Sequence, residues 1–347
     1  MRIRPFILSA ILAATAASPG WADGAPAIAT IKPLHIIARY PIGGNDTGYD
    51  YLQVDVPKRH LFVAHATRVE VLNADNGAKL GEIGGMRGAH GIEIIPSLGK
   101  GYTSDGLDRA VTVFDRDTFR ILGRIRYMGV KPDAIRFDPE TSHLFVVNGG
   151  ETGDVTVIDP VTDAIIGTVQ LGGQKLEQIG FDGRGRAFVN DEGTSVIHVF
   201  DTHTLKPLST WPLAPCEEPT GLAVDLAHHR AFAACGNERL AVVDTNNGNL
   251  VTTVPIGRDP DGAFFDPATQ RLITSNREGT LSVLREVTPD RYETLQTLKT
   301  EPGARTLTFD EQTGRIFLPV ARAAPAAAGG GRPAILPETF AVLAVGP

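Results

Sequence analysis

The sequence predicts an all-β fold, a seven-bladed β-propeller, and three observations lead to it. A unit of four short apolar runs separated by turns recurs about every forty residues along the chain. In the clearest copy, from Lys131 to Val169, runs of Val, Ile, Leu and Phe are broken by Gly, Asp, Asn and Pro. This pattern is typical of a four-stranded antiparallel blade. Seven such units predict a ring of seven blades around a central channel.

The register of the units is fixed by the residue that stands just before the first strand of each. Successive members of this set are 40 to 44 residues apart, so that no unit is missing or doubled. We call the set the inner ring: it consists of Asp50, His90, Asp133, Glu177, Thr220, Asp261 and Arg305.

The last unit is one strand short. It supplies strands near Thr306–Phe309, Arg315–Val320 and Phe340–Val345, whereas the strand-like segment Leu34–Tyr40 precedes the first unit. We expect this N-terminal strand to complete the seventh blade and close the ring, which hides two open edges. The predicted propeller is a single domain over 34–347, and its low-complexity segment 323–337 is expected to be a flexible Ala/Pro/Gly loop of the last blade.

The N-terminus has the pattern of a secretory signal. Arg2 and Arg4 precede an apolar stretch from Phe6 to Ala17, and the small residues of Gly20-Trp21-Ala22 follow. We therefore predict a signal peptide over 1–22 and a linker over 23–33. The apolar stretch is too short for a permanent membrane span. The prediction is a periplasmic or secreted monomer without a transmembrane anchor.

Composition and motifs exclude several classes of function. The net charge of −7 disfavours a nucleic-acid partner, because affinity for phosphates depends on Lys and Arg. The chain lacks the motifs for covalent haem, a serine nucleophile elbow, a P-loop and an EF-hand.

The two cysteines, Cys216 and Cys235, fall in the fifth unit at the same end of a hairpin. In an oxidising compartment they are expected to form a disulfide, with free thiols or a metal pair as the alternatives.

A second set of residues stands at the ends of the second strands, on the same face of the propeller as the inner ring. This second ring consists of His65, Asp105, Asn148, Asp191, Cys235, Asn276 and Val320. Six of the fourteen positions are carboxylates, and like charges that converge on one channel mouth repel each other unless a cation or a proton intervenes. The sequence therefore predicts an acidic upper mouth.

Three interpretations of this mouth stay open: turn-capping residues alone, a ligand or metal site, and a catalytic site. Glu177, Asp261 and Asp133 are the candidate metal ligands, and their oxygens suit Ca²⁺ or Mg²⁺ better than Zn²⁺ or Mn²⁺. His90, on a glycine-flanked loop, is a candidate for ligand contact and proton transfer. Arg305 has two expected roles: it pairs with Asp50 or Asp261, or it binds an anionic group of a substrate. If the site is catalytic, His90 and Arg305 are the candidate catalytic residues.

Four other histidines are predicted to lie at the surface or in a turn. His198 and His203 fall on outer strands of the fourth unit and are predicted to be surface residues. His228 and His229 are predicted to belong to a turn.

Several segments carry a resemblance to known propellers. Leu144–Asn148, Val155–Asp159 and Ile166–Val169 resemble the YVTN-type repeat of bacterial periplasmic and surface proteins, in particular the YncE-like periplasmic propellers, over nearly the whole chain from Leu34. The resemblance implies a seven-bladed ring whose upper face binds a ligand or a partner.

Two strand-entry motifs resemble a different family. Pro260-Asp261-Gly262 and Pro219-Thr220-Gly221, together with Glu177, are similar to the motifs of metal-dependent gluconolactonase-like propellers, where Glu, Asn and Asp hold a divalent ion. Thr220 stands where the family's Asn is expected, and that family has six blades.

The function that these observations favour is binding of an unidentified small ligand or periplasmic protein at the acidic mouth, with no assigned reaction and no certain cofactor. The alternative is a metal-dependent hydrolase or lyase, in which a divalent cation polarises a carbonyl and His90 moves a proton. Whether the protein is an enzyme stays open at this point.

Overall fold

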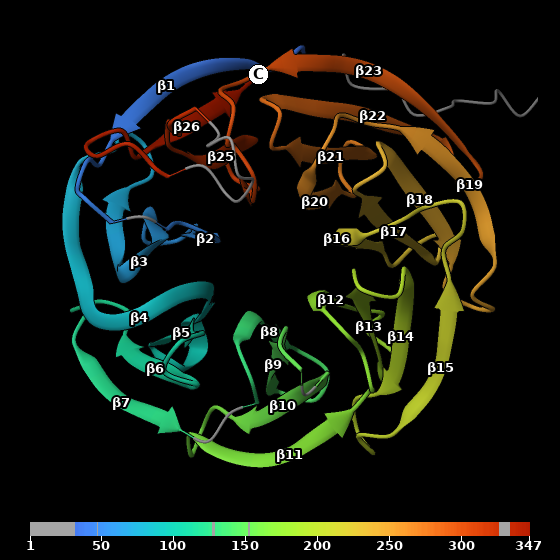
Figure 1. Ribbon diagram of the computed structural model, residues 1–347, viewed down its shortest axis with the longest axis horizontal. Helices are drawn as coiled ribbons and strands as arrows, with labels where there is room; N and C mark the ends of the chain where they lie inside the picture. Colours follow the sequence, from blue (N-terminus) through green and yellow to red (C-terminus); the bar gives the residue numbers. More distant parts are fainter. Residues whose placement is uncertain (1–31, 47, 127–128, 152, 326–333) are drawn as a thin grey trace, which may run out of the picture. The chain divides into compact units, whose positions relative to one another are not determined.

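A computed structural model describes residues 32–46, 48–126, 129–151, 153–325 and 334–347 of the protein. The predicted signal peptide and the predicted linker up to residue 31 lie outside the described residues. Lys32–Pro347 form one compact unit, in which β-sheets follow one another around a ring (Figure 1). The one helix among the described residues is a short 3₁₀ turn, Pro96–Leu98. None of the described helices is long and apolar enough to cross a membrane.

Four of the sheets are consecutive four-stranded meanders. The first consists of β8 (Pro132–Asp138), β9 (His143–Asn148), β10 (Asp154–Asp159) and β11 (Ala164–Gln170), and the second of β12 (Leu176–Phe181), β13 (Arg186–Asp191), β14 (Val196–Asp201) and β15 (Pro207–Pro212). The third consists of β16 (Pro219–Asp225), β17 (Arg230–Cys235), β18 (Arg239–Asp244) and β19 (Leu250–Pro255), and the fourth of β20 (Pro260–Asp266), β21 (Arg271–Asn276), β22 (Thr280–Thr288) and β23 (Arg291–Lys299).

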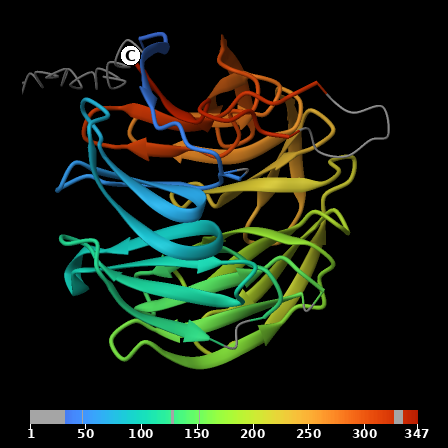
Figure 2. The same cartoon turned by 60° about the vertical axis from the view of Figure 1, so that its left-hand side comes forward.

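The first part of the chain forms a larger sheet with six strands, which Figure 2 brings forward. Its strands are β2 (Leu52–Asp55), β3 (His60–Asn73), β4 (Lys79–Ile95), β5 (Lys100–Asp105), β6 (Ala110–Asp115) and β7 (Ile121–Arg126). The prediction of seven separate blades is therefore wrong: the described residues form six sheets, because the first two sequence units share one.

The merger has a local cause in β3 and β4. Each of these strands runs through a boundary where the sequence predicts two strands. β3 pairs with β4 at Arg68↔Gly84 and again at Ala66↔Ala89, across an irregularity where Ala66 has a φ of 49°. β4 then pairs with β5 from Ala89↔Asp105 onward. A bulge of this kind bends a ladder without ending it, so the hydrogen bonding continues from the first unit into the second.

The last sheet joins the two ends of the described chain. It contains β24 (Thr308–Asp310), β25 (Arg315–Val320), β26 (Ala341–Gly346) and, outside β26, the N-terminal strand β1 (His35–Pro41). β1 is antiparallel to β26, from His35↔Gly346 to Pro41↔Ala341, and the blue and red strands lie side by side in Figure 1. The predicted flexible loop 323–337 leaves this sheet between β25 and β26. Residues 326–333 lie outside the described part, and Ala323 forms an isolated bridge with Ile335.

An aromatic side chain at one repeated position fills the space between neighbouring sheets. It is the third residue of the second strand in six of the seven sequence units, and it has no solvent exposure: Phe62, Tyr102, Phe145, Phe188, Phe232 and Phe317. Phe145 of β9 packs on Phe181 of β12, and Phe232 of β17 packs on Phe265 of β20. Because large rings bury much apolar area, these contacts hold the sheets at a fixed spacing and with them the inner strands.

Candidate functional site

The inner strands surround one large cavity. Its volume is about 560 Å³, and all seven residues of the inner ring line it. They enter from β4, β8, β12, β16 and β20 and from the segments just before β2 and β24. Other polar residues that line it are Asp46, Tyr49, Arg87, Lys131, Lys175, Glu192, Glu218, Asp259 and Arg277. The sequence therefore located the cavity wall but missed the cations that contribute to it.

A break in the strand register accompanies most inner-ring residues. In the innermost strands the pairing shifts at Ala89/Ile92, Pro132/Ile135, Leu176/Ile179, Pro219/Leu222 and Pro260/Gly262. Each shift encloses an inner-ring residue, namely His90, Asp133, Glu177, Thr220 or Asp261. Side chains of a regular strand alternate between its two faces, and an irregularity of this kind changes the direction of one of them. This explains how a strand made mostly of apolar residues presents one polar side chain to the cavity.

The backbone at these irregularities is held by side chains from the adjacent unit. Ser104 donates to the carbonyl oxygen of Asp133 at 2.5 Å, and Asn190 donates to that of Thr220 at 3.1 Å. Ser275 likewise donates to the carbonyl of Arg305. The sequence analysis missed these three residues, although each is a polar residue directly before a second-ring residue in an otherwise apolar strand.

Arg305 is the central cation of the cavity wall. Its Nε lies 2.6 Å from Oδ2 of Asp261, and its Nη2 lies 3.2 Å from Oδ1 of Asp50. Arg277, a cation outside the predicted set, contacts Asp261 at 2.8 Å. Of the two roles left open for Arg305, the structure places it in ion pairs with both predicted carboxylates.

His90 extends this network on the other side of Asp50. Its Nδ1 lies 2.6 Å from Oδ2 of Asp50. Burial opposes ionisation of Asp50, but Arg305 and His90 outweigh it and lower the pKa of this carboxyl to about 2. The pKa of His90 is raised: burial acts to lower it, but the hydrogen bond that His90 donates to Asp50 and the charge of Asp133 prevail. The pair can therefore hold a proton on His90 beside an ionised carboxylate.

Glu177 is the least compensated carboxyl of the inner ring. Lys175 lies 3.4 Å away and also contacts Glu192, whereas Lys131 lies 3.2 Å from Asp133. Burial of Glu177, followed by the charges of Asp133 and Asp261, raises its pKa well above the ordinary value. A positive charge in the cavity would relieve this repulsion.

Tyr51 closes the cavity toward the other end of the ring. It lines both the large cavity and a void of about 10 Å³ beside Ile92 and Ala134. Its side chain is buried, and burial together with the surrounding carboxylates raises its pKa well above 10. Its hydroxyl therefore stays protonated and can donate a hydrogen bond into the cavity.

The predicted metal ligands do not come together as a set. Among the described residues, the carboxylate and imidazole groups close enough to share an ion are Asp50, His90 and Asp133 in the cavity, and Asp225, His228 and Glu286 elsewhere. Glu177 and Asp261 belong to neither group, and Asp261 already contacts two arginines. The Glu177, Asp261 and Asp133 set therefore does not fit one divalent ion, and only Asp133 of the three is near other ligating groups.

The second-ring residues are buried outside the cavity wall and bind within their own units. Asp105 accepts from Thr112, Asn148 donates to Asp154 and Thr156, and Asn276 donates to Thr280 and Ser282. His65 lies 3.4 Å from Glu70, and the pKa of Asp105 is raised to about 6, chiefly by burial. These side chains form hydrogen bonds between the second and third strands of their units. They therefore support the site and do not line it.

Asp191 illustrates this supporting role and corrects one expectation. Its two oxygens accept from the backbone N–H groups of Gln174 and Lys175 at 3.1 and 3.0 Å, and these hydrogen bonds hold the loop that leads to Glu177. Nε2 of His198 lies 3.3 Å from Asp191. The prediction that His198 is a surface residue is wrong, because its side chain is buried against this carboxylate.

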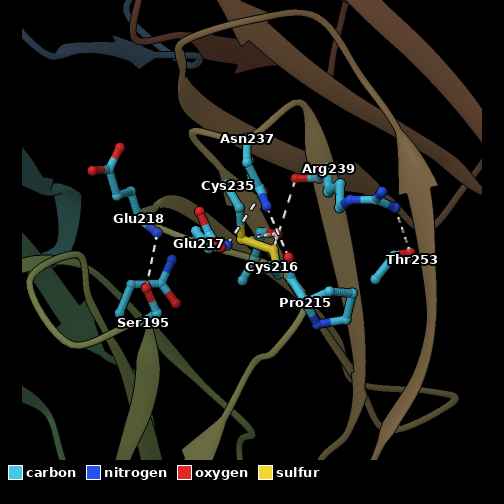
Figure 3. Close-up of a disulfide and its surroundings, with 12 residues drawn as sticks. Ser195, Pro215, Cys216, Glu217, Glu218, Cys235, Asn237, Arg239 and Thr253 are labelled. Atoms are coloured by element: carbon cyan, nitrogen blue, oxygen red, sulfur yellow. Dashed lines mark hydrogen bonds between the residues drawn. A yellow bond between two sulfur atoms is a disulfide. The ribbon is translucent and has the colours of Figure 1, made fainter.

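The predicted disulfide between Cys216 and Cys235 is confirmed. Figure 3 shows how it attaches the loop before β16 to the end of β17. Glu218 follows in this loop, lines the cavity, and donates a hydrogen bond from its backbone N–H to Oγ of Ser195 at 3.0 Å. The disulfide thus fixes one part of the cavity wall.

Comparison with known proteins adds no family to this description: no family model matches the chain, and no curated protein matches it at a significant level.

Proposed function

We propose that the protein binds a small polar molecule in the central cavity and that the ligand carries a positively charged group such as an ammonium. The single observation that carries this proposal is the convergence of all seven inner-ring residues on one cavity of about 560 Å³. This volume is typical of small-molecule sites, which combine a concave surface with a few oriented polar groups.

The balance of charge supports a cationic group. Eight carboxylates line the cavity: Asp46, Asp50, Asp133, Glu177, Glu192, Glu218, Asp259 and Asp261. Five permanently charged cations face them: Arg87, Lys131, Lys175, Arg277 and Arg305. The acidic excess attracts positive charge and repels anions, which favours an amine over a dicarboxylate.

Glu177 is the residue that we propose to contact the ammonium. Burial and then the neighbouring charges of Asp133 and Asp261 raise its pKa, and a bound cation between these groups would lower it again. This ammonium can belong to a free amine or to a lysine side chain of a partner protein, because both present the same group to Glu177.

The cellular setting is part of the proposal. A disulfide and the predicted signal peptide support an oxidising compartment, periplasmic or extracellular. The similarity of the repeat to YVTN-type, YncE-like propellers supports the same setting, and we propose that relationship on the repeat motifs alone.

The proposal is tested by thermal unfolding with three probes: an aliphatic diamine, a short lysine-containing peptide and a dicarboxylate of the diamine's length. We expect the diamine to raise the unfolding midpoint, as a ligand specific for the folded state does, and the dicarboxylate to leave it unchanged. A response to the peptide and not to the diamine would identify a protein partner as the source of the ammonium. Preferential stabilisation by the dicarboxylate would refute the cationic ligand.

A second function rests on the group formed by Asp50, His90 and Asp133. A divalent ion held there would polarise a carbonyl, and His90 would transfer a proton, as in a metal-dependent hydrolase or lyase. This function predicts turnover of a lactone or ester that stops with a chelator and returns with metal. Turnover that survives both chelation and Asp133→Asn would eliminate it.

A further inference from the structure

A second cluster of acidic and imidazole groups lies away from the cavity, at the opposite end of β16 from Thr220. Asp225 is the last residue of β16, His228 stands in the turn that follows, and Glu286 comes from β22 of the next sheet. Nδ1 of His228 lies 2.7 Å from Oδ2 of Asp225 and 2.7 Å from Oε1 of Glu286. Two carboxylates thus converge on a single imidazole nitrogen.

The cluster offers the facing oxygens of Asp225 and Glu286 a single hydrogen-bond donor, Nδ1 of His228. Nδ1 of an imidazole carries one hydrogen at most, and the hydrogen bond of His228 is made to Asp225. Both carboxylate oxygens of Glu286 are buried and accept no hydrogen bond from the described residues, and the residue is only 4% exposed. A buried carboxylate in this state needs a cation or a proton.

The repeats provide an internal comparison for the histidine. At the place of His228, other units have a threonine whose hydroxyl donates to the aspartate that ends the first strand: Thr141 to Asp138, Thr269 to Asp266 and Thr313 to Asp310. Those three units satisfy the turn with a neutral hydroxyl. His228 makes the same contact, but it adds a group that can bind a metal ion.

A second internal comparison concerns the facing residue. The N–H of Glu286 bonds to the carbonyl of Gln270, as that of Arg116 bonds to Gly99 at the matching position of the second unit. Arg116 contacts Asp55, the counterpart of Asp225, through both Nε and Nη2. Where the boundary between the first and second units has a cation against this aspartate, the boundary between the fifth and sixth units therefore has a second carboxylate.

Arg230, the cation of the same turn, is engaged elsewhere. Its guanidinium binds the carbonyls of Pro289, His228 and His229 and the carboxylate of Asp290. It also lies 3.7 Å from Asp244, and no ion pair links it to Asp225 or Glu286 among the described residues. Among the described residues, His228 is therefore the group that remains to pair with the two carboxylates, together with any ion bound beside it.

We propose that Asp225, His228 and Glu286 form a binding site for a first-row divalent cation such as Zn²⁺ or Mn²⁺. An imidazole nitrogen and carboxylate oxygens are common ligands of these ions in proteins. The side chain of His228 is 38% exposed, which gives an ion a path from solvent, whereas the carboxylates are buried and preorganised. The site is independent of the central cavity and links the β16–β19 sheet to the β20–β23 sheet.

The test is a calorimetric titration of Zn²⁺ alone into metal-stripped protein, with His228→Thr and Glu286→Gln as the variants. Threonine is the residue that other units carry at this turn, so His228→Thr should fold. We expect the wild-type protein to bind one ion in this cluster and each variant to bind it more than about tenfold more weakly, since even the loss of an outer-shell contact costs about that much. His203→Thr is the matched control, because His203 faces only Glu140 and should not affect binding.

Two further variants make the outcome decisive. His90→Asn removes the imidazole of the cavity group and should leave the proposed site intact. Glu286→Arg reproduces the pairing of Arg116 with Asp55, and should abolish Zn²⁺ binding while keeping the metal-free unfolding midpoint at or above that of the wild type. Absence of Zn²⁺ binding by the wild type, or binding that persists in His228→Thr and Glu286→Gln, would overturn the proposal. In either case His228 would act only as the hydrogen-bond partner of Asp225 in the turn.

Discussion

Arg305 joins Asp261 to Asp50 across the boundary where the last and first parts of the ring meet. Nε of Arg305 lies 2.6 Å from Asp261, and Nη2 lies 3.2 Å from Asp50. Both aspartates are almost fully buried. One guanidinium therefore bridges two inner-ring carboxylates that lie far apart in the sequence.

Loss of this guanidinium should destabilise the fold. In Arg305→Gln the two buried carboxylates lose the cation that they share, although Arg277 stays beside Asp261 and His90 beside Asp50, and we expect a loss of about 3 kcal/mol in the free energy of unfolding. Urea denaturation measures it. Arg39→Gln is the control, because Arg39 pairs with Glu301 at the exposed surface and its removal should cost less than about 1 kcal/mol. Equal losses in the two variants would contradict the central role of Arg305.

Glu177 should make stability depend on pH in a defined direction. Because its pKa in the folded protein is raised above the unfolded value, the folded state holds the proton more tightly, and stability falls as pH rises from the unfolded pKa through the folded one. Glu177→Gln remains neutral and escapes this loss. We expect the ligand-free variant to match the wild type near pH 4 and to exceed its unfolding midpoint at pH 8. Parallel pH profiles would show that Glu177 is not strained by its neighbours.

The disulfide should contribute strongly to stability. Cys216 and Cys235 are 19 residues apart, and closure of a loop of this size stabilises a protein by about 3 kcal/mol. The double variant Cys216→Ala/Cys235→Ala should lose about this amount in chemical denaturation, and reduction of the wild type should reproduce the loss. A midpoint unchanged by reduction would contradict a structural disulfide.

Ser104 should act on the cavity through Asp133. Its hydroxyl accepts from the N–H of Gly91 and donates to the carbonyl of Asp133, and both bonds are buried. Ser104→Ala should therefore cost about 1 to 3 kcal/mol, because two backbone groups lose their partner. Ser209→Ala, on the exposed β15, should be neutral. A neutral Ser104→Ala would mean that the irregularity at Asp133 holds without it.

The sequence predicted the cavity wall well because the repeat sets it. Turn residues and apolar runs fix the start of the first strand in each unit. The seven inner-ring residues, from Asp50 to Arg305, were identified from that position alone, and all of them line the cavity. The disulfide followed from the same register. These features depend on local pattern and on the spacing of units.

The remaining features depend on contacts between units, which no local pattern encodes. Ala66 allows β3 and β4 to continue one ladder, so two units share a sheet. Lys131 and Arg277 stand two residues before Asp133 and one residue after Asn276, and only the folded ring shows that both reach the cavity. His198 was assigned to the surface because its strand is near the outside, yet Asp191 of the neighbouring strand binds it.

The most direct test of the account is calorimetric titration of an aliphatic diamine at pH 8 into the wild type, Glu177→Gln and Glu311→Gln. Glu311 is an exposed carboxylate in the turn after β24 and serves as the control. The account predicts saturable binding to the wild type and to Glu311→Gln, and a large loss of affinity in Glu177→Gln. Diamine binding that is equal in all three proteins, or no binding of either the diamine or the lysine-containing peptide to the wild type, would contradict a cation-binding site at the centre of the ring.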